Sequence, residues 1–443
     1  MVPTSSIPPP TSDLVRAIGR WSLISLMVNL IIGAGIFGLP AAVAGILGTQ
    51  SPFAYLFAAA GMGVIAACVA EVASRFHQAG GPYLYAKVAF GRFLGLQTGW
   101  LLGLTRVSSA AAVSNIFLDY LDGFWPHAKE PVARLVILTI LIGGLALINI
   151  RGVKLGTWVS NLFTIGKLVP LLILVVAGLF FIHSQGSPIL RVQASHPAGA
   201  WLSAVLLLIY AFTGFESALI PGGEVNEPRR DIPIALMAAV PLVTTIYFLV
   251  QVVVVHTLAN PAQSARPLSA AAFVVGGNTM ATIVALGALL STFGSLAANM
   301  VANPRITFAL AEQGDFPRWF AAIHRRYQTP YVSIAVFAVL LWALAALGTF
   351  RWNATLSAIS RLFAYMITCA ALPALRKKLP GKEGFRLPAG SVFATVGILF
   401  VLVLASRMGI AEVAALVATA SFAFLNWLAV RRNGYELTEN TKP

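Results

Sequence analysis

Long runs of apolar residues, separated by short polar segments, recur along almost the whole chain. A helix needs roughly 20 apolar residues to cross the hydrocarbon core of a bilayer. Twelve stretches approach or exceed this length: residues 21–47, 52–76, 93–121, 132–150, 153–182, 201–221, 234–258, 280–310, 331–349, 355–375, 387–406 and 409–430. The pattern therefore predicts an all-α membrane protein with about twelve transmembrane helices in one membrane domain.

The composition agrees with this pattern, because 58% of the 443 residues are hydrophobic and only 10% are charged. Soluble domains carry about 25% charged residues. Most of the 30 lysine and arginine residues fall in alternate loops on one side of the predicted membrane, and positively charged loops remain cytoplasmic. We therefore expect a multi-pass protein of the inner (plasma) membrane, surrounded by the lipid bilayer, with both termini in the cytoplasm.

The net charge of +15 follows from this asymmetry of the loops, so it does not indicate a nucleic-acid partner. The proline-rich start lacks the basic and apolar regions of a cleavable signal peptide. Residues 1–20 are therefore expected to form a disordered cytoplasmic tail, and residues 431–443 a second tail. The six histidines and two cysteines show no metal-ligand spacing, and no nucleophile stands beside a base. We expect no metal, no cofactor and no enzymatic activity.

The first apolar span is interrupted by three glycines and a proline, in the segment 31–40. Glycine and proline both weaken a helix. One interpretation is a face of small residues for close helix packing. The other is a broken helix, whose exposed N–H groups at the start of the second half would bind an anionic group such as a carboxylate.

A second interruption favours the broken-helix interpretation. The sixth span contains Gly214 and the acidic Glu216 within an apolar stretch, and Thr213 follows Gly33 by 180 residues. Each interruption lies in the first helix of a group of five spans. Two inverted groups of five helices would bring both breaks together near the midplane. The predicted units are a first repeat at 21–182, an inverted repeat at 201–378, and two further helices at 387–430.

The sequence also resembles the amino acid, polyamine and organocation superfamily of permeases along nearly its whole length. The matching segments lie in the two interrupted spans and in three loops: residues 33–37, 79–85, 212–216, 226–233 and 305–317. This superfamily folds as two inverted five-helix repeats plus two helices. The resemblance implies secondary transport of amino acids or related amines.

The resemblance further implies how a substrate would be held. The backbone amides of Gly33, Ala34 and Gly35 would bind a carboxylate. Carbonyl groups near Ile32 and in the segment that precedes Gly214 would accept from an ammonium group; that segment includes Tyr210, Phe212 and Thr213. Tyr210 occupies the place of an aromatic that covers the substrate. The alternative for Tyr210 is packing against a neighbouring helix.

Two ionisable residues within predicted spans are candidates for coupling. Lys167 lies midway along the fifth span and, by resemblance, would replace a bound sodium ion; its alternative is to extend towards the cytoplasmic interface. Glu216 lies beside the second break, where burial disfavours the charged form and permits proton binding. Glu216 could instead pair with Arg106 or Arg361 in the third and tenth spans.

Other polar residues are expected to line the interior or to join helices. In the eighth span Ser291, Ser295, Asn299 and Asn303 recur every four residues, which places them on one helix stripe. Such a stripe lines the substrate path or makes interhelical hydrogen bonds, and Asn299 is the member predicted to contact substrate. Glu71 is expected to form a structural pair near Arg75.

Charged residues in two cytoplasmic loops are predicted to form ion pairs at the inner gate, unless they are simply solvated. They are Arg229, Arg230, Asp231, Arg305, Glu312 and Asp315. Together these features predict alternating access with proton symport of a neutral amino acid. Exchange of amino acids or polyamines is the alternative coupling, and a transporter-like sensor is the alternative class.

Overall fold

A computed structural model describes residues 19–76, 81–152, 157–186, 196–215, 227–379 and 385–439. The first half contains α1 (Arg20–Ile31), α2 (Gly35–Leu47), α3 (Ser51–Ala73), α4 (Gly81–Phe90), α5 (Arg92–Leu121), α6 (Pro131–Ile150) and α7 (Thr157–Ser184). The second half contains α8 (Ala198–Ile209), α10 (Pro228–Thr257), α11 (Pro267–Glu312), α12 (Tyr331–Leu347), α13 (Phe350–Lys378), α14 (Gly390–Ala405) and α15 (Ile410–Glu439). The described residues form helices and no strands, which confirms the all-α membrane class.

Each predicted span coincides with a helix or a pair of helix segments among the described residues. In this part of the chain, eight helical stretches are long and apolar enough to cross a membrane, and four further apolar helices are shorter. Two of the shorter helices are α1 and α8, which end where the first and sixth predicted spans are interrupted. The interruptions in the sequence are therefore real ends of helices.

Two elements depart from the predicted pattern. The helix α4 was not predicted, because its 10 residues are too few to cross a bilayer. Helix α11 begins well before the predicted span, and it is kinked where Gly276 and Gly277 leave the helical conformation. Gly277 has a φ of +69°, a left-handed value that glycine adopts readily.

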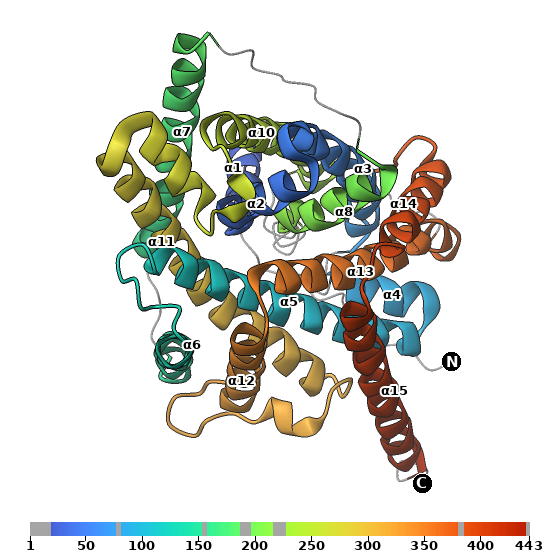
Figure 1. The fold of residues 1–443 in the computed structure, drawn as a ribbon. Coiled ribbons are helices and arrows are strands. Elements are labelled where there is room, and N and C mark those ends of the chain that lie inside the picture. The colour runs from blue at the N-terminus through green and yellow to red at the C-terminus, as the bar shows by residue number, and fades with distance from the viewer. Residues whose placement is uncertain are drawn as a thin grey trace.

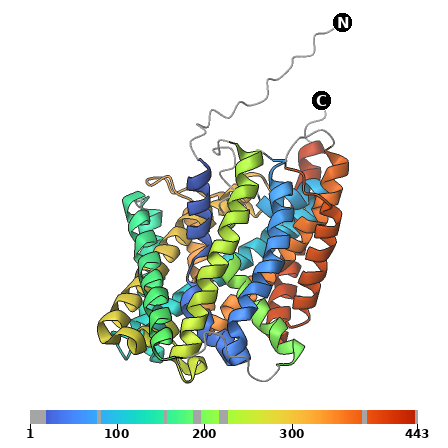
Figure 2. The same cartoon turned by 90° about the horizontal axis from the view of Figure 1, so that it is seen from above.

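The helices form one bundle in which α5 and α13 run side by side through the middle (Figure 1). Helices α1, α2, α3, α8 and α10 gather on one side of this pair (Figure 1). The start of α1 and the end of α15 lie at the same end of the bundle (Figure 2). Large apolar side chains remain exposed on the outer helices, among them Ile140 and Phe422. In a bilayer these side chains would contact lipid tails.

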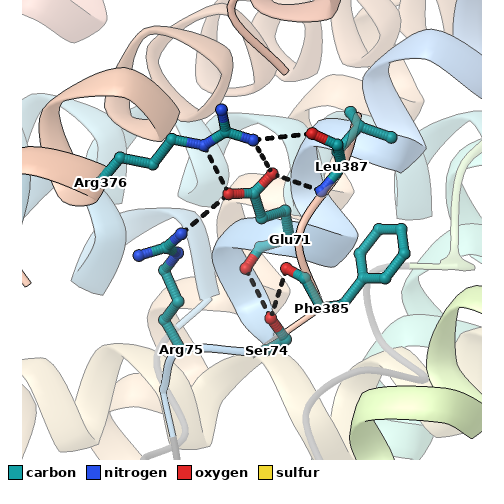
Figure 3. Close-up of polar contacts among 6 residues, drawn as sticks. All are labelled: Glu71, Ser74, Arg75, Arg376, Phe385 and Leu387. Carbon is teal, nitrogen blue, oxygen red and sulfur yellow. Dashed lines mark hydrogen bonds and ion pairs between the residues drawn. The ribbon is translucent and has the colours of Figure 1, made fainter. Parts of the chain in front are cut away.

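A buried carboxylate joins α3 to α13 and to the segment before α14 (Figure 3). Glu71 accepts two hydrogen bonds from the Arg376 guanidinium, at 2.8 and 2.7 Å. It also accepts from Arg75, at 2.9 Å, and from the backbone N–H of Leu387, at 2.9 Å. The predicted structural pair of Glu71 with Arg75 is confirmed. Arg376, which lies 305 positions from Glu71 in the sequence, donates more hydrogen bonds to this carboxylate than Arg75 does.

Candidate functional site

The first helix break separates α1 from α2 by three residues. Ile32 still donates its N–H to the Val28 carbonyl, at 2.9 Å, as a helical residue does. The N–H of Gly33 instead turns to the Ile31 carbonyl, at 2.8 Å. In a continuous helix that N–H would bond the Asn29 carbonyl, four residues earlier. The break therefore releases the carbonyl of Asn29 and those that follow it in the last turn of α1.

Beyond the break, α2 starts again at Gly35 with Ala34 as its N-cap residue. The first N–H groups of a helix have no acceptor within that helix, and they carry the positive end of its dipole. The predicted residues Ile32, Gly33, Ala34 and Gly35 thus lie where carbonyl groups of one helix end meet N–H groups of the next. Such a junction offers partners to both an ammonium and a carboxylate group.

The second break follows α8. The chain tightens into a 3₁₀ turn from Tyr210 to Phe212, becomes extended at Thr213 (φ −86°, ψ 161°) and turns at Gly214, whose φ is +113°. The hydroxyl of Thr213 donates to the carbonyl of Tyr210, at 2.8 Å. Helical hydrogen bonding ends here, as the sequence predicts. Glu216 lies outside the described residues.

The two breaks contact one another although they are far apart in the sequence. A Cβ atom built on Gly214 would overlap the Leu30 carbonyl oxygen and lie 2.9 Å from its carbon. A Cβ atom built on Gly35 would lie 3.3 Å from the Tyr210 ring and 3.4 Å from the Cα atom of Ala211. Each break therefore packs its glycine against the backbone or ring of the other. The predicted meeting of the two interruptions is confirmed.

A tyrosine that the sequence analysis did not single out bridges both breaks. The Tyr247 hydroxyl, on α10, lies 2.9 Å from the Ile31 carbonyl oxygen and 3.2 Å from that of Ala211. Its ring packs edge-on against Phe212 and Tyr55, with centroids 5.6 and 6.0 Å away. Tyrosine hydroxyls in apolar surroundings usually find a partner. The sequence could therefore have indicated that the Tyr247 hydroxyl has a hydrogen-bond partner, but only the fold identifies the carbonyl groups that it contacts.

One turn further along α10, Gln251 holds α2 against the start of α3. Its side-chain amide donates to the Ser51 hydroxyl, at 2.6 Å, and to the Pro40 carbonyl, at 3.2 Å. Tyr55 donates to its oxygen, at 3.3 Å. All of these side chains are buried. Helix α10 therefore positions both the break and the half-helix that follows it.

Lys167 reaches the first break from α7. Its ammonium nitrogen lies 2.5 Å from the Asn29 carbonyl oxygen, which is the group released by the turn at Gly33. The side chain of Lys167 is buried, with only 8% of the residue exposed. Lys167 thus contacts the broken helix at the end of α1.

The aromatic residues of the second break are packed on several sides. Tyr210 donates to the Ser109 carbonyl, at 3.3 Å, and meets Phe350 edge to face at 6.2 Å between centroids. Phe215 stacks on Tyr365 of α13 at 5.8 Å. Tyr210 therefore has the contacts of a packing residue and also borders Gly35. Its role as a cover over the substrate remains a prediction.

Asn299 belongs to a polar chain between α11 and α5. Arg106 donates to the Asn303 side chain, at 3.0 Å, and Asn303 donates to Asn299, at 2.9 Å. Asn299 in turn donates to the Ser295 carbonyl, at 2.7 Å. The predicted polar stripe thus makes an interhelical connection through Arg106. Contact between Asn299 and a substrate stays a prediction.

Two of the predicted loop carboxylates form ion pairs, with partners outside the predicted set. Asp231 at the start of α10 pairs with Arg20 at the start of α1, at 2.9 Å. Asp315, after α11, is buried and pairs with Lys87 at 2.6 Å and Arg92 at 2.7 Å. The Tyr83 hydroxyl also donates to Asp315. These contacts tie α1 to α10, and α4 to the end of α11.

The partners of Asp315 set its ionisation. Burial would raise the pKa of the Asp315 carboxyl, but hydrogen bonds from Lys87, Tyr83 and Arg92 outweigh it and hold the pKa below its ordinary value. A carboxyl with a lowered folded-state pKa stabilises the fold above its unfolded pKa, near 3.9. This stabilisation is lost as the pH falls through the folded-state pKa.

We therefore expect the wild type to be more stable to heat than Asp315→Asn. This difference in stability should be full at pH 7 and should shrink as the pH falls below about 4. Thermal unfolding of both proteins in detergent, at pH 7 and at a series of pH values below 4, measures it. A difference that stayed constant with pH would show that the Asp315 charge does not provide the stabilisation.

Comparison with known proteins agrees with this architecture. The family described as "Amino acid permease" matches residues 18–427. Uncharacterized transporters of Mycobacterium bovis and Mycobacterium tuberculosis are each 31% identical over 409 residues, which cover 87% of this chain and 90% of theirs. A second uncharacterized transporter of M. tuberculosis is 30% identical over 397 residues, with 82% of this chain and 81% of its own covered. This chain therefore belongs to the amino acid permease family of the amino acid, polyamine and organocation superfamily, and it is a membrane transporter.

Proposed function

We propose that the chain transports a neutral amino acid together with a proton by alternating access. The observation that carries this proposal is the contact between the two helix breaks, at Gly214 with Leu30 and at Gly35 with Tyr210. Both breaks expose backbone groups inside the bundle. Backbone groups at helix ends recognise the charged groups that all amino acids share, and leave the side chain to be selected by its surroundings.

The charges of the helix ends suit a zwitterion. The start of α2 presents N–H groups at its positive end, which favours the carboxylate. The ends of α1 and of the turn at Phe212 present carbonyl groups, which favour the ammonium. Around them lie buried aromatic and apolar side chains, including Phe212 and Phe215. These surroundings support a neutral side chain on the substrate.

Lys167 and Glu216 are the proposed coupling residues. The Lys167 ammonium holds the carbonyl of Asn29, so loss of its proton would change how the end of α1 is held. An ammonium buried in an apolar span is costly and is usually retained for a function. We assign Lys167 to proton release, with Glu216 as a second proton acceptor. The alternative coupling is exchange of one amino acid for another, in which Lys167 stays charged.

The proposal includes the geometry of transport. Residues 21–182 and 201–378 would form the two inverted repeats, and the first two helices of each would rock against the others. Both termini would face the cytoplasm across the inner membrane. An epitope tag inserted at residue 190 should then be accessible from outside intact cells, and a cytoplasmic tag would refute this orientation.

Uptake of radiolabelled amino acids and polyamines into proteoliposomes tests the function. Accumulation of a neutral amino acid driven by an inward proton gradient is the expected result. Uptake that requires internal substrate, with or without a gradient, would establish the exchanger. If none of these compounds entered in either condition, the assignment to amino acid transport would be rejected and the sensor would become the better interpretation.

Replacement of Lys167 separates the two couplings. We expect Lys167→Ala to abolish gradient-driven accumulation, because the variant leaves the Asn29 carbonyl without its cation and removes the proposed proton carrier. Lys129→Ala is the matched control, since Lys129 follows the end of α5, is 45% exposed, and pairs with Asp119 in the last turn of that helix. Unchanged pH-dependent uptake by Lys167→Ala would exclude Lys167 from coupling.

A further inference from the structure

Three exposed arginines lie where two loops meet at one end of the bundle. Arg151 follows the end of α6, and Arg325 and Arg326 lie in the loop between α11 and α12. The two loops are joined because the Thr329 hydroxyl donates to the carbonyl of Ile150, at 2.6 Å. The fold therefore brings together basic residues that are far apart in the sequence. We call these three arginines the arginine surface.

The turn that carries Arg325 and Arg326 is held by a histidine. The Nδ1 atom of His324 accepts from the N–H groups of Arg326 and Tyr327, at 3.2 and 3.3 Å. The His324 carbonyl accepts from the N–H of Gln328, at 2.9 Å. The guanidinium carbon of Arg326 lies 5.5 Å from the centroid of the Tyr327 ring. Both arginines therefore belong to an ordered turn.

Within the described part of the chain, no carboxylate pairs with the arginine surface. Residues 316–352, which include the loop and all of α12, contain no aspartate or glutamate. Asp315, the carboxylate that precedes this segment, is buried and already paired with Lys87 and Arg92. The arginine surface therefore has a positive charge that an external anion can balance.

Apolar side chains are exposed beside these arginines. Trp319 and Ile323, in the same loop, are 52% and 47% exposed, and Tyr331 at the start of α12 is 40% exposed. Helices α6 and α12 lie at the edge of the bundle (Figure 1). Both expose large apolar side chains, such as Ile140 and Val339. Because the loop directly precedes α12, it lies at the boundary between lipid tails and water, where exposed tryptophan and tyrosine are enriched.

We propose that the arginine surface binds the phosphate group of an anionic phospholipid, with Trp319 and Ile323 against its acyl chains. A guanidinium group presents a fork of N–H donors that matches the oxygens of a phosphate. The tails would extend along the outer faces of α6 and α12. A phospholipid supplies both the anion and the apolar chains, whereas free phosphate supplies the anion alone. The exposed apolar side chains therefore favour the lipid.

Basic residues beside a span also fix the orientation of a membrane protein during insertion. That role requires charge alone. It requires neither an ordered turn nor an exposed tryptophan beside the charge. Binding of lipid to the folded protein therefore separates the two roles, because orientation is already fixed in the purified chain.

The experiment titrates the full chain in detergent with phosphatidylglycerol or phosphatidylcholine and counts bound lipid by native mass spectrometry. Phosphatidylglycerol should bind more tightly. One basic residue near an anionic headgroup contributes about fivefold in affinity, so Arg151→Gln should weaken this binding about fivefold and Arg325→Gln/Arg326→Gln about thirtyfold. Lys377→Gln/Lys378→Gln is the matched control, because it removes the same charge from exposed residues at the end of α13. The control should bind as the wild type does.

Fluorescence locates the bound lipid. Phosphatidylglycerol brominated in its acyl chains should quench Trp319, since the proposal places the chains against this ring. The part of the tryptophan quenching that Arg325→Gln/Arg326→Gln loses should therefore also be absent from Trp319→Phe. If Trp319→Phe retained that part, the lipid would not lie at the arginine surface.

Three binding results would overturn the proposal: equal affinity for both lipids, unchanged affinity in the arginine variants, or an equal loss in the α13 control. Soluble glycerol phosphate should compete only at far higher concentrations than the lipid. Competition at the concentrations of the lipid itself would identify a site for soluble anions and reject the lipid. These measurements do not depend on the transported substrate, so failure of the proposed transport would leave them unchanged.

Discussion

A methyl group added at Gly214 is expected to reduce uptake to a small residual rate. Gly214 has a φ of +113°, which residues with a side chain rarely adopt, and its added Cβ atom would overlap the Leu30 carbonyl oxygen. Strained backbone of this kind costs about 1–3 kcal/mol, and the overlap must in addition push α1 away from the second break. A total of about 3 kcal/mol against the competent arrangement corresponds to about a hundredfold loss of uptake.

Initial uptake rates of Gly214→Ala and wild type in proteoliposomes measure this effect. Gly103→Ala is the matched control, because Gly103 lies within α5 and a Cβ atom there would meet nothing within 4 Å. The control should transport at the wild-type rate. Normal uptake by Gly214→Ala would mean that the two breaks do not act together, and the proposed site would then be incorrect.

Glu71→Gln is expected to have the largest effect on stability. The substitution keeps the shape of the side chain but removes the negative charge between Arg75 and Arg376, whose side chains are only 9% and 21% exposed. Removal of one partner of a buried ion pair costs about 3–5 kcal/mol, mainly because the remaining charges are left desolvated. Glutamine retains part of the hydrogen bonding, so we expect a loss of about 3 kcal/mol.

Thermal unfolding in detergent provides the measurement. Glu130→Gln is the control: Glu130 pairs with His127 at 2.7 Å, but both side chains are more than 60% exposed. Exposed ion pairs contribute little to stability, so the control should unfold at the same temperature as the wild type. If both substitutions lowered the unfolding temperature equally, burial of the Glu71 cluster would not be the source of its stability.

Much of the fold could be predicted from the sequence because membrane helices carry their own pattern. Apart from the two interrupted spans, most predicted spans became helices close to their predicted bounds, since a backbone in lipid must satisfy its hydrogen bonds internally. The short helix α4 and the early start of α11 were missed. Neither depends on a membrane-length apolar run, so hydropathy alone does not indicate them.

The site was predicted in part. The sequence indicated Gly33, Gly35 and Gly214 because glycine within an apolar span weakens the helix. It indicated Lys167 because a charged side chain within such a span is costly to bury. Tyr247 and Gln251 were not indicated, since a single polar group within an apolar span does not indicate which groups it will bond. Their function follows from the carbonyl groups they meet, at Ile31, Ala211 and Pro40, and those groups come from other parts of the chain.

The sequence by itself thus determined the class of protein, the places where helices break, and the family to which the chain is similar. These features depend on local hydropathy and backbone preference, which are properties of residues that are adjacent in the sequence. Only the tertiary structure decided which groups meet: Gly214 with Leu30, Lys167 with the carbonyl of Asn29, and Glu71 with Arg376. Such contacts join residues up to about 300 positions apart, and their geometry depends on how all the helices pack together.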